Sequence, residues 1–262
     1  MVKDALTYGV AEFIEGRFQE TEVTAIQEVP LTIYLNGHEV VTLLCTGKYT
    51  KFLALGFLKS DGLITDRNQL KGMRVEEEPE RLKVHVETSH DPFEPQRLER
   101  SITSGCGKGT NFERNVETIA STTVTAKLTV TPEQILQLAA ELKERSTLYR
   151  ATRGCHNALL ATPEEILIFR EDIGRHNAID MICGQCFLDN IPTEDKLIVS
   201  TGRIASEILL KVIRLGVPIL ASGSAATRFS IDLARRTNMT LVGQVRQERM
   251  VVYNHGGRIS GL

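Results

Sequence analysis

The chain has 262 residues, of which 42% are hydrophobic and 24% are charged, as in a globular protein of one large domain or two. A net charge of −2 excludes a global attraction to nucleic acid or to an anionic membrane. The N-terminal MVKDALTYGV lacks the basic start and apolar run typical of a signal peptide, so none is expected there, and no apolar run is long enough to span a bilayer. We therefore expect a cytoplasmic protein whose five cysteines are reduced thiols.

Residues 23–87 have the pattern of an α+β domain. The segment LTIYLNGHEVVTLLC alternates apolar and polar residues around Asn36-Gly37, which predicts a hairpin. The next segment, TKFLALGFLKSDG, has apolar residues at helical spacing and ends on a glycine, which predicts a helix. RLKVHVETS alternates again and predicts a strand. We expect a small N-terminal α+β domain over residues 1–120.

Residues 90–123 lose this periodicity. DPFEP and ITSGCGKGTNF are rich in proline, glycine and small polar residues, which is typical of a mobile linker at a domain boundary. Within it Cys106 lies between two glycines, which predicts an accessible sulfur and a backbone that can move. Lys108 is a nearby cation that favours the reactive thiolate. Local sequence alone indicates either a reactive thiol or an incidental loop cysteine.

From Thr131 onward helices alternate with strands, and we expect a C-terminal α/β domain that binds the nucleotide cofactor over residues 121–262. TPEQILQLAAELKERS begins with a threonine cap and a proline, which predicts a helix. Short apolar runs predict strands in NALLAT, EILIFRE, DKLIVS, VPILAS and MTLVGQV. Helical segments separate several of them, notably HNAIDMICGQCFLDN, IASEILLKVIRLG and AATRFSIDLARRTN. This order predicts a three-layer α/β domain with a largely parallel sheet.

Two strand-to-helix turns of this domain are candidate phosphate sites. The first contains Thr201, Gly202 and Arg203, and the second contains Ser222, Ser224 and Thr227. Ligands bind where the carboxyl ends of strands meet helix N-termini, and the helix dipole there favours an anion. The alternative is ordinary helix capping by hydroxyl side chains.

The stretch REDIGRHN follows an apolar strand and precedes a helix. It contains Arg170, Asp172 and His176, whose side chains suit recognition of a polar ligand at the end of a strand. The alternative is a solvated turn whose charges neutralise one another.

Other cysteine and histidine patterns have a structural interpretation. Cys155 is expected to be a small buried hydrophobe, and the adjacent His156 either faces the ligand edge or is a structural histidine. Cys183 and Cys186 form the sole C-x-x-C, within an expected helix, and are expected to pack against the sheet. The sequence His85-Val86-Glu87 resembles half of a zinc deaminase motif, but no proline-cysteine partner follows it in the required pattern.

Taken together and in order, the quoted motifs resemble the formate dehydrogenase accessory proteins that act as sulfurtransferases. The resemblance runs over most of the chain and includes IYLNGHE, LALGFLKSDGLI, SGCG, RGCHNALL, REDIGRHNAID, STGRIASEI, GVPILASGSAAT and LVGQVRQERMVVY.

This resemblance implies a sulfur carrier. A cysteine desulfurase would load Cys106 with persulfide sulfur, which then passes to the bis-molybdopterin guanine dinucleotide cofactor of formate dehydrogenase. It also implies a homodimer, a cytidine-deaminase-like C-terminal domain without zinc, and GDP as a surrogate ligand. The family's cofactor contact corresponds here to Gln244, Val245, Arg246, Gln247, Glu248 and Arg249.

The chain departs from the family pattern at two positions. Gly109 stands where many members have a second cysteine, so sulfur transfer would rely on Cys106 alone. Gln244 stands where an aromatic residue is common, so base stacking is not expected there. Two other functions stay open: a guanine-nucleotide-binding module without sulfur chemistry, and a zinc nucleoside deaminase relative.

Overall fold

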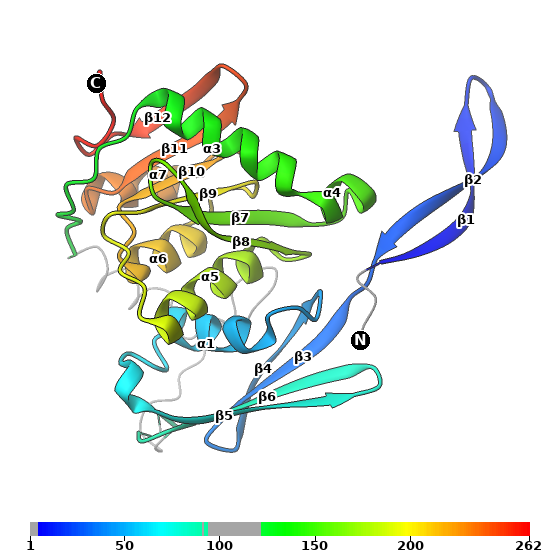
Figure 1. Cartoon of the computed structure of the whole chain (residues 1–262), viewed down its shortest axis with the longest axis horizontal. Coiled ribbons are helices and arrows are strands. Elements are labelled where there is room, and N and C mark those ends of the chain that lie inside the picture. Colours follow the sequence, from blue (N-terminus) through cyan, green and yellow to red (C-terminus); the bar gives the residue numbers. More distant parts are fainter. Residues whose placement is uncertain (1–4, 91, 94–121) are drawn as a thin grey trace.

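The computed structural model describes residues 5–90, 92–93 and 122–262, which form two packed lobes and a projecting arm (Figure 1). The strands are β1 (Ala5–Ile14), β2 (Arg17–Ile26), β3 (Val29–Leu35), β4 (His38–Cys45), β5 (Leu70–Glu78), β6 (Arg81–Thr88), β7 (His156–Ala161), β8 (Ile166–Asp172), β9 (Leu197–Ser200), β10 (Ile219–Ser222), β11 (Thr240–Arg246) and β12 (Arg249–Asn254). The helices are α1 (Thr50–Ser60), the short 3-10 helix η1 (Arg67–Gln69), α3 (Pro132–Arg145), α4 (Thr147–Thr152), α5 (Arg175–Asp189), α6 (Ser206–Leu215) and α7 (Arg228–Arg236). Among the described residues, no helix combines the length and apolarity needed to cross a membrane.

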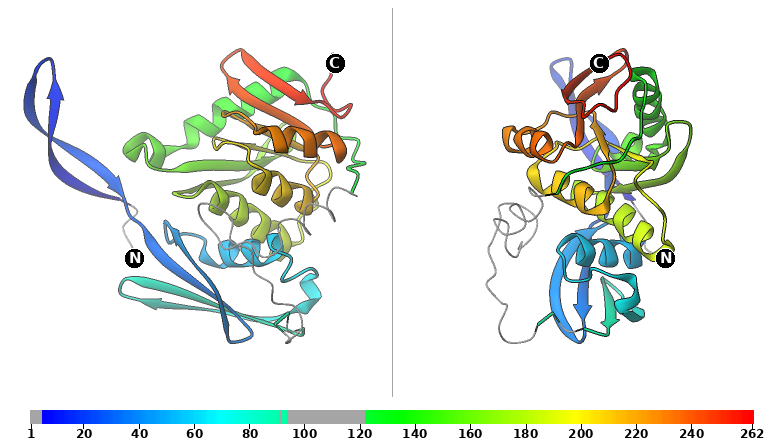
Figure 2. Two further views of the ribbon diagram at one scale, coloured as in Figure 1. Left: turned by 180° about the vertical axis from the view of Figure 1, so that it is seen from behind. Right: turned by 90° about the vertical axis from the view of Figure 1, so that its left-hand side faces the viewer.

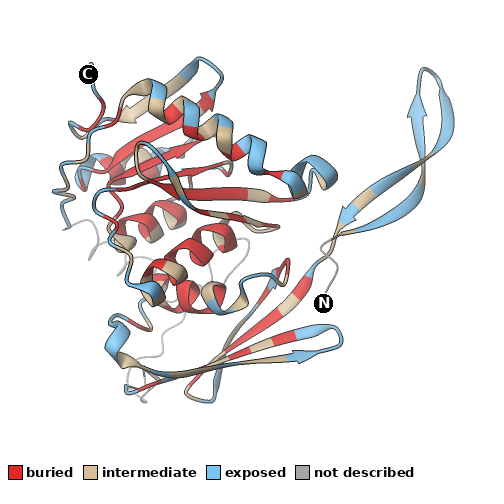
Figure 3. Cartoon of the chain, in the orientation of Figure 1, coloured by how far each residue is buried: buried red, intermediate tan, exposed pale blue. Residues whose placement is uncertain are grey.

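The arm is an antiparallel ribbon of β1 and β2 that extends away from both lobes (Figures 1 and 3). Glu15 and Gly16 form its tight turn, both with positive φ. Near the tip the rings of Phe13 and Phe18 lie 5.1 Å apart, yet both side chains are largely exposed. This ribbon was not predicted from the sequence, although apolar and polar residues alternate on either side of Glu15-Gly16.

The N-terminal lobe contains a four-stranded sheet in the order β4-β3-β6-β5. The predicted hairpin is confirmed: Asn36 and Gly37 both have positive φ, as a two-residue turn between twisted strands requires. The predicted helix is α1, which buries Leu53, Leu55 and Leu58 against one face of the sheet.

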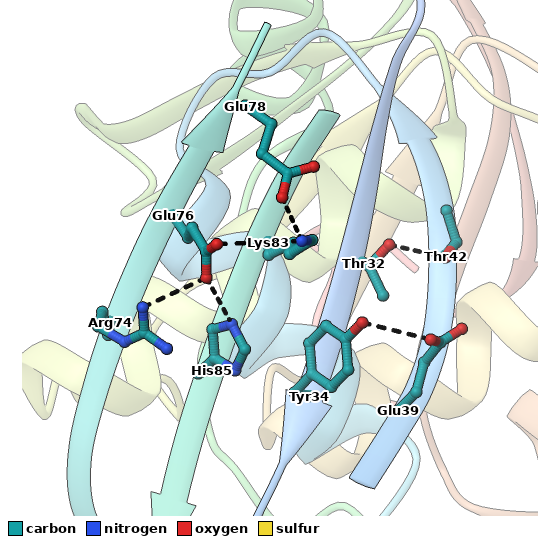
Figure 4. A network of polar contacts seen from close by, with 9 residues as sticks. All are labelled: Thr32, Tyr34, Glu39, Thr42, Arg74, Glu76, Glu78, Lys83 and His85. Carbon is teal, nitrogen blue, oxygen red and sulfur yellow. Dashed lines mark hydrogen bonds and ion pairs between the residues drawn. The ribbon is translucent and has the colours of Figure 1, made fainter. Parts of the chain in front are cut away.

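The other face of this sheet carries polar side chains (Figure 4). His85 stacks on Tyr34 with ring centroids 4.7 Å apart, and its Nε2 lies 3.3 Å from an oxygen of Glu76. His85 therefore belongs to a cross-strand ladder. Among the described residues, no group of three or more His, Cys, Asp and Glu side chains is arranged to hold a metal ion.

The C-terminal lobe contains a six-stranded sheet in the order β12-β11-β10-β9-β7-β8. Only β9, β10 and β11 pair in parallel, so the prediction of a largely parallel sheet is wrong outside the centre. β7 is antiparallel to both β8 and β9, and β12 is antiparallel to β11. The reason is that short turns join β7 to β8 and β11 to β12, whereas a parallel pair needs a long crossover.

Helices cover both faces of the six-stranded sheet, which gives the expected three layers. α3 packs on one face through Ile135, Leu138 and Leu142. The helices α5, α6 and α7 contribute to the core on the other face. The predicted cap of α3 is confirmed, because the hydroxyl of Thr131 accepts from the N–H of Gln134.

The lobes meet where α1 crosses α5 (Figure 2). Two glycines allow the helix backbones to touch at this crossing. A Cβ at Gly56 would lie 1.7 Å from the carbonyl oxygen of Asp180, and one at Gly184 would lie 1.9 Å from that of Phe52. Met181 of α5 belongs to the core of the N-terminal lobe, so the two cores are continuous in this region. The boundary predicted at residues 120 and 121 stays a prediction, because residues 94–121 lie outside the described part of the chain.

A buried ion pair lies beside this crossing. Lys211 of α6 places Nζ 2.7 Å from both carboxylate oxygens of Asp180. The Oδ1 atom of Asp180 also accepts a hydrogen bond from Ser60 Oγ at 2.8 Å. Arg214 donates to the carbonyl oxygen of Ser60. These contacts join α1, α5 and α6. They also give the buried Asp180 carboxylate a cation and a hydrogen-bond donor, which a buried charge requires.

Candidate functional site

Two predicted phosphate-binding turns lie side by side at the carboxyl ends of β9 and β10. The backbone N–H of Gly223 donates to Ser200 O at 3.0 Å, and that of Ile204 donates to Ala225 O at 3.1 Å. The two turns are thus held to each other by main-chain hydrogen bonds. This is the juxtaposition that neighbouring parallel strands create at a ligand-binding edge.

The serine hydroxyls of these turns bond to the protein itself. Ser222 Oγ donates to Gly202 O at 2.7 Å, and Ser224 Oγ donates to Thr201 O at 2.8 Å. Thr201 Oγ1 in turn accepts from the backbone N–H of Asn157 on β7 at 3.0 Å. These side chains therefore join three segments of the edge, and the two serine protons are already donated.

Thr227 and Arg203 differ from the other residues of the turns. Thr227 caps α7, with its hydroxyl 2.8 Å from that of Ser230 and accepting from the Ser230 N–H at 3.4 Å. For Thr227, the alternative of ordinary helix capping by a hydroxyl side chain is therefore confirmed. Arg203 is exposed.

The segment from Gln244 to Arg249 spans the end of β11, the turn at Gln247 and Glu248, and the first residue of β12. The N–H of Gln244 donates to Ser224 O at 3.0 Å, and its Nε2 donates to Tyr253 Oη at 3.3 Å. Gln244 has φ 54°, in the left-handed region, and the pairing of β11 with β12 shifts register between Gly243 and Arg246. The strand therefore bends at this edge. Val245 is buried, and the exposed remainder comprises Arg246, Gln247, Glu248 and Arg249. Of this segment, Gln244 is the residue that contacts the turn at Ser224.

Arg170 lies between the lobes and away from solvent. Its guanidinium stacks on the Tyr49 ring at 3.9 Å and donates to Phe169 O and to Gln185 Oε1. Burial lowers the pKa of Arg170. Its contact with a ligand stays a prediction, and one that requires Arg170 to leave these partners.

Asp172 is fully buried and joins the lobes directly. One carboxylate oxygen accepts from the N–H and hydroxyl of Thr46, at 2.9 and 3.0 Å. The other accepts from the N–H of Gly174 at 3.0 Å and from Asn177 Nδ2 at 2.7 Å. Burial raises the pKa of Asp172, although these hydrogen bonds act in the opposite direction. Asp172 therefore has a structural role, and its ligand contact stays a prediction.

His176 lies at the edge together with His156, for which the sequence left a ligand-facing position open, and with Arg175 and Glu207, which the sequence did not indicate as ligand contacts. Its Nε2 is 3.2 Å from Glu207 Oε2 in the first turn of α6. The neighbouring Arg175 packs against Gly202, where a Cβ would lie 2.8 Å from Arg175 Cβ. His156 begins β7, and its pKa is lowered by burial and by the charges of Arg175 and His176. We call His156, Arg175, His176 and Glu207 the edge cluster.

The sequence contains only a weak signal that His156 and His176 lie together. RGCHN and GRHN each place a histidine beside a predicted strand end, but nothing in one dimension pairs them. The antiparallel register of β7 and β8 sets His156 opposite Asp172, and α5 begins three residues later. Tertiary structure thus brings together two separate sequence motifs.

The described cysteines are buried. Burial raises the pKa of Cys45, Cys155 and Cys186 to about 12, and it also raises that of Cys183. The predictions that Cys155, Cys183 and Cys186 fill the interior are confirmed. Cys106, the predicted sulfur-carrying residue, lies outside the described residues.

Comparison with known proteins places the chain in a family. The sequence model of the FdhD/NarQ family matches residues 26–260. The chain is 40% identical over 250 residues to the sulfur carrier protein FdhD of Geobacillus kaustophilus (strain HTA426), covering 95% of each chain. It is 38% identical over 251 residues to the protein of the same name from Bacillus pumilus (strain SAFR-032), covering 96% of each.

A solved structure has the same fold. It is a putative formate dehydrogenase accessory protein from Desulfotalea psychrophila, with a TM-score of 0.81 and 23% sequence identity, and the match covers 98% of this chain and 100% of that one. The fold and the near full-length sequence matches agree, and this chain belongs to the FdhD/NarQ family.

Proposed function

We propose that this protein is a cytoplasmic sulfur carrier in the service of formate dehydrogenase, and that Cys106 carries the sulfur. The observation that carries the proposal is the similarity, over 95% of the chain, to proteins named as sulfur carriers. The fold shared with a putative formate dehydrogenase accessory protein supports the same role.

The cysteine environments support Cys106 as the reactive thiol. The attacking species in sulfur transfer is a thiolate, and a thiol whose pKa is about 12 is almost entirely protonated near pH 7. Cys45, Cys155 and Cys186 are in that condition, and Cys183 is buried as well. Cys106 is left as the carrier among the five cysteines of the chain.

The loading step needs no external oxidant or reductant. The Cys106 thiolate attacks the terminal sulfur of a persulfide on a cysteine desulfurase. The sulfur–sulfur bond of the desulfurase breaks, its cysteine leaves as a thiolate, and Cys106–S–SH forms. Since Gly109 stands where many relatives have a second cysteine, Cys106 acts without a loop partner.

The sulfur recipient in this proposal is bis-molybdopterin guanine dinucleotide. The C-terminal lobe is a cytidine-deaminase-like domain that has no zinc, and it holds the cofactor at the edge that includes Thr201–Arg203, Ser222–Thr227 and Gln244. GDP serves as a surrogate ligand. A homodimer is part of the proposal, and light scattering of the purified chain tests it.

Sulfur labelling tests the carrier role. The chain is incubated with a cysteine desulfurase and cysteine labelled in its sulfur, and label released by a reductant is measured. Cys106→Ala is expected to lose the releasable label, whereas Cys155→Ala, a matched control at a buried cysteine, retains it. Equal label on wild type and Cys106→Ala would refute the carrier role and favour a nucleotide-binding module without sulfur chemistry.

Metal analysis separates the remaining alternative. A zinc nucleoside deaminase relative would purify with about one zinc ion per chain and would release ammonia from cytidine or adenosine. We expect neither from this protein. Stoichiometric zinc together with deaminase activity would replace the sulfur-carrier proposal.

A further inference from the structure

The arm of β1 and β2 exposes apolar side chains that share a face. Successive residues of a strand point to opposite faces, and the register of β1 with β2 sets Tyr8 opposite Val23. Leu6, Tyr8, Ile14 and Val23 therefore lie on one face, and each is between 39% and 52% exposed. Exposed apolar side chains gathered on one face are typical of a surface that another molecule covers.

The opposite face of the arm is aromatic and acidic. It carries Phe13 and Phe18, which are 61% and 74% exposed, and next to them Glu20 and Glu22. Residues 5–26 contain four glutamates and one arginine, so the arm has a net charge of −3. A protein surface that receives this face is therefore expected to be basic.

A basic surface with the opposite charge surrounds α4 in the same chain. Residues 143–153, which we call the α4 surface, contain four exposed basic side chains and one exposed glutamate, a net charge of +3. Tyr149 is exposed among them, and the guanidinium of Arg153 lies 5.4 Å from the centroid of its ring. The α4 surface thus combines cations with an exposed aromatic ring and complements the acidic face of the arm.

The arm does not lie on the α4 surface of its own chain. Its base packs beside α4, where a Cβ at Gly154 would lie 3.0 Å from Ile26 Cγ2. From there the arm extends away from both lobes (Figures 1 and 2). Ten paired residues at about 3.3 Å each put the tip about 30 Å from the base. The basic counterpart of the acidic face therefore belongs to another molecule.

We propose that two copies of this chain exchange their arms, and that each arm lays its acidic face on the α4 surface of the other copy. The inference rests on the homodimer of the proposed function and adds the contact through which that dimer forms. Because α4 lies at the base of the arm, a two-fold axis beside the two bases brings each arm to the α4 surface of the other copy. Two arms packed on each other would instead bring together two charges of −3, which opposes association.

Charge reversal on each side of the contact tests the exchange. Glu20→Lys with Glu22→Lys reverses the arm, and Arg145→Glu with Arg153→Glu reverses the α4 surface. Sedimentation equilibrium gives the dissociation constant of each dimer. Each variant alone is expected to dimerise at least about tenfold more weakly than wild type, because like charges then face each other. An equimolar mixture is expected to dimerise as wild type does, because both contacts of the mixed dimer again join opposite charges.

Two further variants complete the experiment. Arg235→Glu with Arg236→Glu makes the same change of charge on α7, at the opposite end of the C-terminal lobe from α4, and is expected to dimerise as wild type does (Figure 1). Deletion of residues 1–22 removes the arm and is expected to give a monomer. In dilute solution, where the copies are apart, circular dichroism of every variant should match wild type, so that loss of the dimer is not loss of the fold.

A dimer that persists after deletion of residues 1–22 would overturn the inference and leave the homodimer in place. The inference is also wrong if the α4 reversal dimerises as wild type does, or if the mixture is no tighter than its two components. A monomeric wild type would refute both the arm exchange and the homodimer. Sulfur labelling of Cys106 is measured separately, so none of these results alters the test of the carrier role.

Discussion

At the residue scale, Asp172 shows how a side chain selected for ligand binding can serve the fold. Its two oxygens accept four hydrogen bonds, from Thr46, Gly174 and Asn177. The sequence predicts a polar residue at a strand end but gives no indication of Thr46, which lies 126 positions away. Burial of the carboxylate therefore became apparent only from the packing of the lobes.

Asp172→Asn is expected to destabilise the protein even though it removes a buried charge. The amide keeps the shape but replaces one acceptor with a donor, which leaves an N–H of Thr46, Gly174 or Asn177 without an acceptor. The expected loss is about 1–3 kcal/mol in the free energy of unfolding, measured in urea. Glu165→Gln, at an exposed acidic residue, should change it by less than about 0.5 kcal/mol. Equal stability of Asp172→Asn and wild type would contradict the structural role.

Two glycines in equivalent turns give a matched pair of substitutions. A Cβ at Gly202 would lie 2.8 Å from Arg175 Cβ, whereas one at Gly223 would meet no atom closer than 3.8 Å. We expect Gly202→Ala to force this turn and Arg175 apart and to lower GDP affinity about tenfold or more, because the turn Thr201–Arg203 is part of the proposed cofactor edge. Gly223→Ala is expected to retain wild-type affinity, and the comparison is made by calorimetry. Similar affinities of the two variants would show that Arg175 does not depend on this glycine.

At the element scale, local signals predicted the elements that local chemistry specifies. Asn36-Gly37 predicts the β3–β4 hairpin, and Thr131 with Pro132 predicts the start of α3, because turn and cap preferences act over a few residues. The strand directions were not predictable in the same way. β7 and β8 are joined by a short turn and therefore pair antiparallel, which the pattern of alternating helices and strands did not indicate.

The close crossing of α1 and α5 predicts that Gly184 cannot be replaced without loss of stability. A methyl group there would lie 1.9 Å from Phe52 O and 2.7 Å from the nitrogen of Gly56, both backbone atoms, so the helices would have to separate. We expect Gly184→Ala to lower the free energy of unfolding by about 3 kcal/mol or more, measured in urea.

Gly9→Ala is the control for that substitution, since a Cβ at Gly9 has no atom within 4 Å. It should change the free energy of unfolding by less than about 1 kcal/mol. Tolerance of alanine at Gly184 would mean that α1 and α5 are farther apart than in this structure.

At the scale of the whole molecule, the β1–β2 arm is distinct from the two lobes. Most of its residues are exposed, and a two-stranded ribbon has little stability of its own (Figure 3). We expect deletion of residues 1–22 to change the free energy of unfolding by less than about 1 kcal/mol, as measured by circular dichroism in urea. For comparison, Leu31→Ala in the core should cost about 2–5 kcal/mol.

A large loss of stability on deleting the arm would contradict this expectation. It would show that β1 and β2 support the body, either through the contacts of β2 with α4 or through contacts with another chain. Light scattering of the same variant would then reveal whether those contacts belong to the proposed homodimer.

Motif order and hydrophobic period are one-dimensional, so they were enough to indicate the family, most elements of the two lobes and the burial of Cys155, Cys183 and Cys186. The elements β5, α4 and β12 were not predicted. Which polar residues are free to bind a ligand depends on the packing of the lobes and turns, which the sequence did not indicate. Asp172 and Arg170 lie between the lobes, and Ser222 and Ser224 bond to the adjacent turn. His156 and Arg175 meet because antiparallel strand pairing and the start of α5 bring distant motifs to one edge. A residue's availability depends on neighbours that are remote in the chain, and sequence spacing does not specify them.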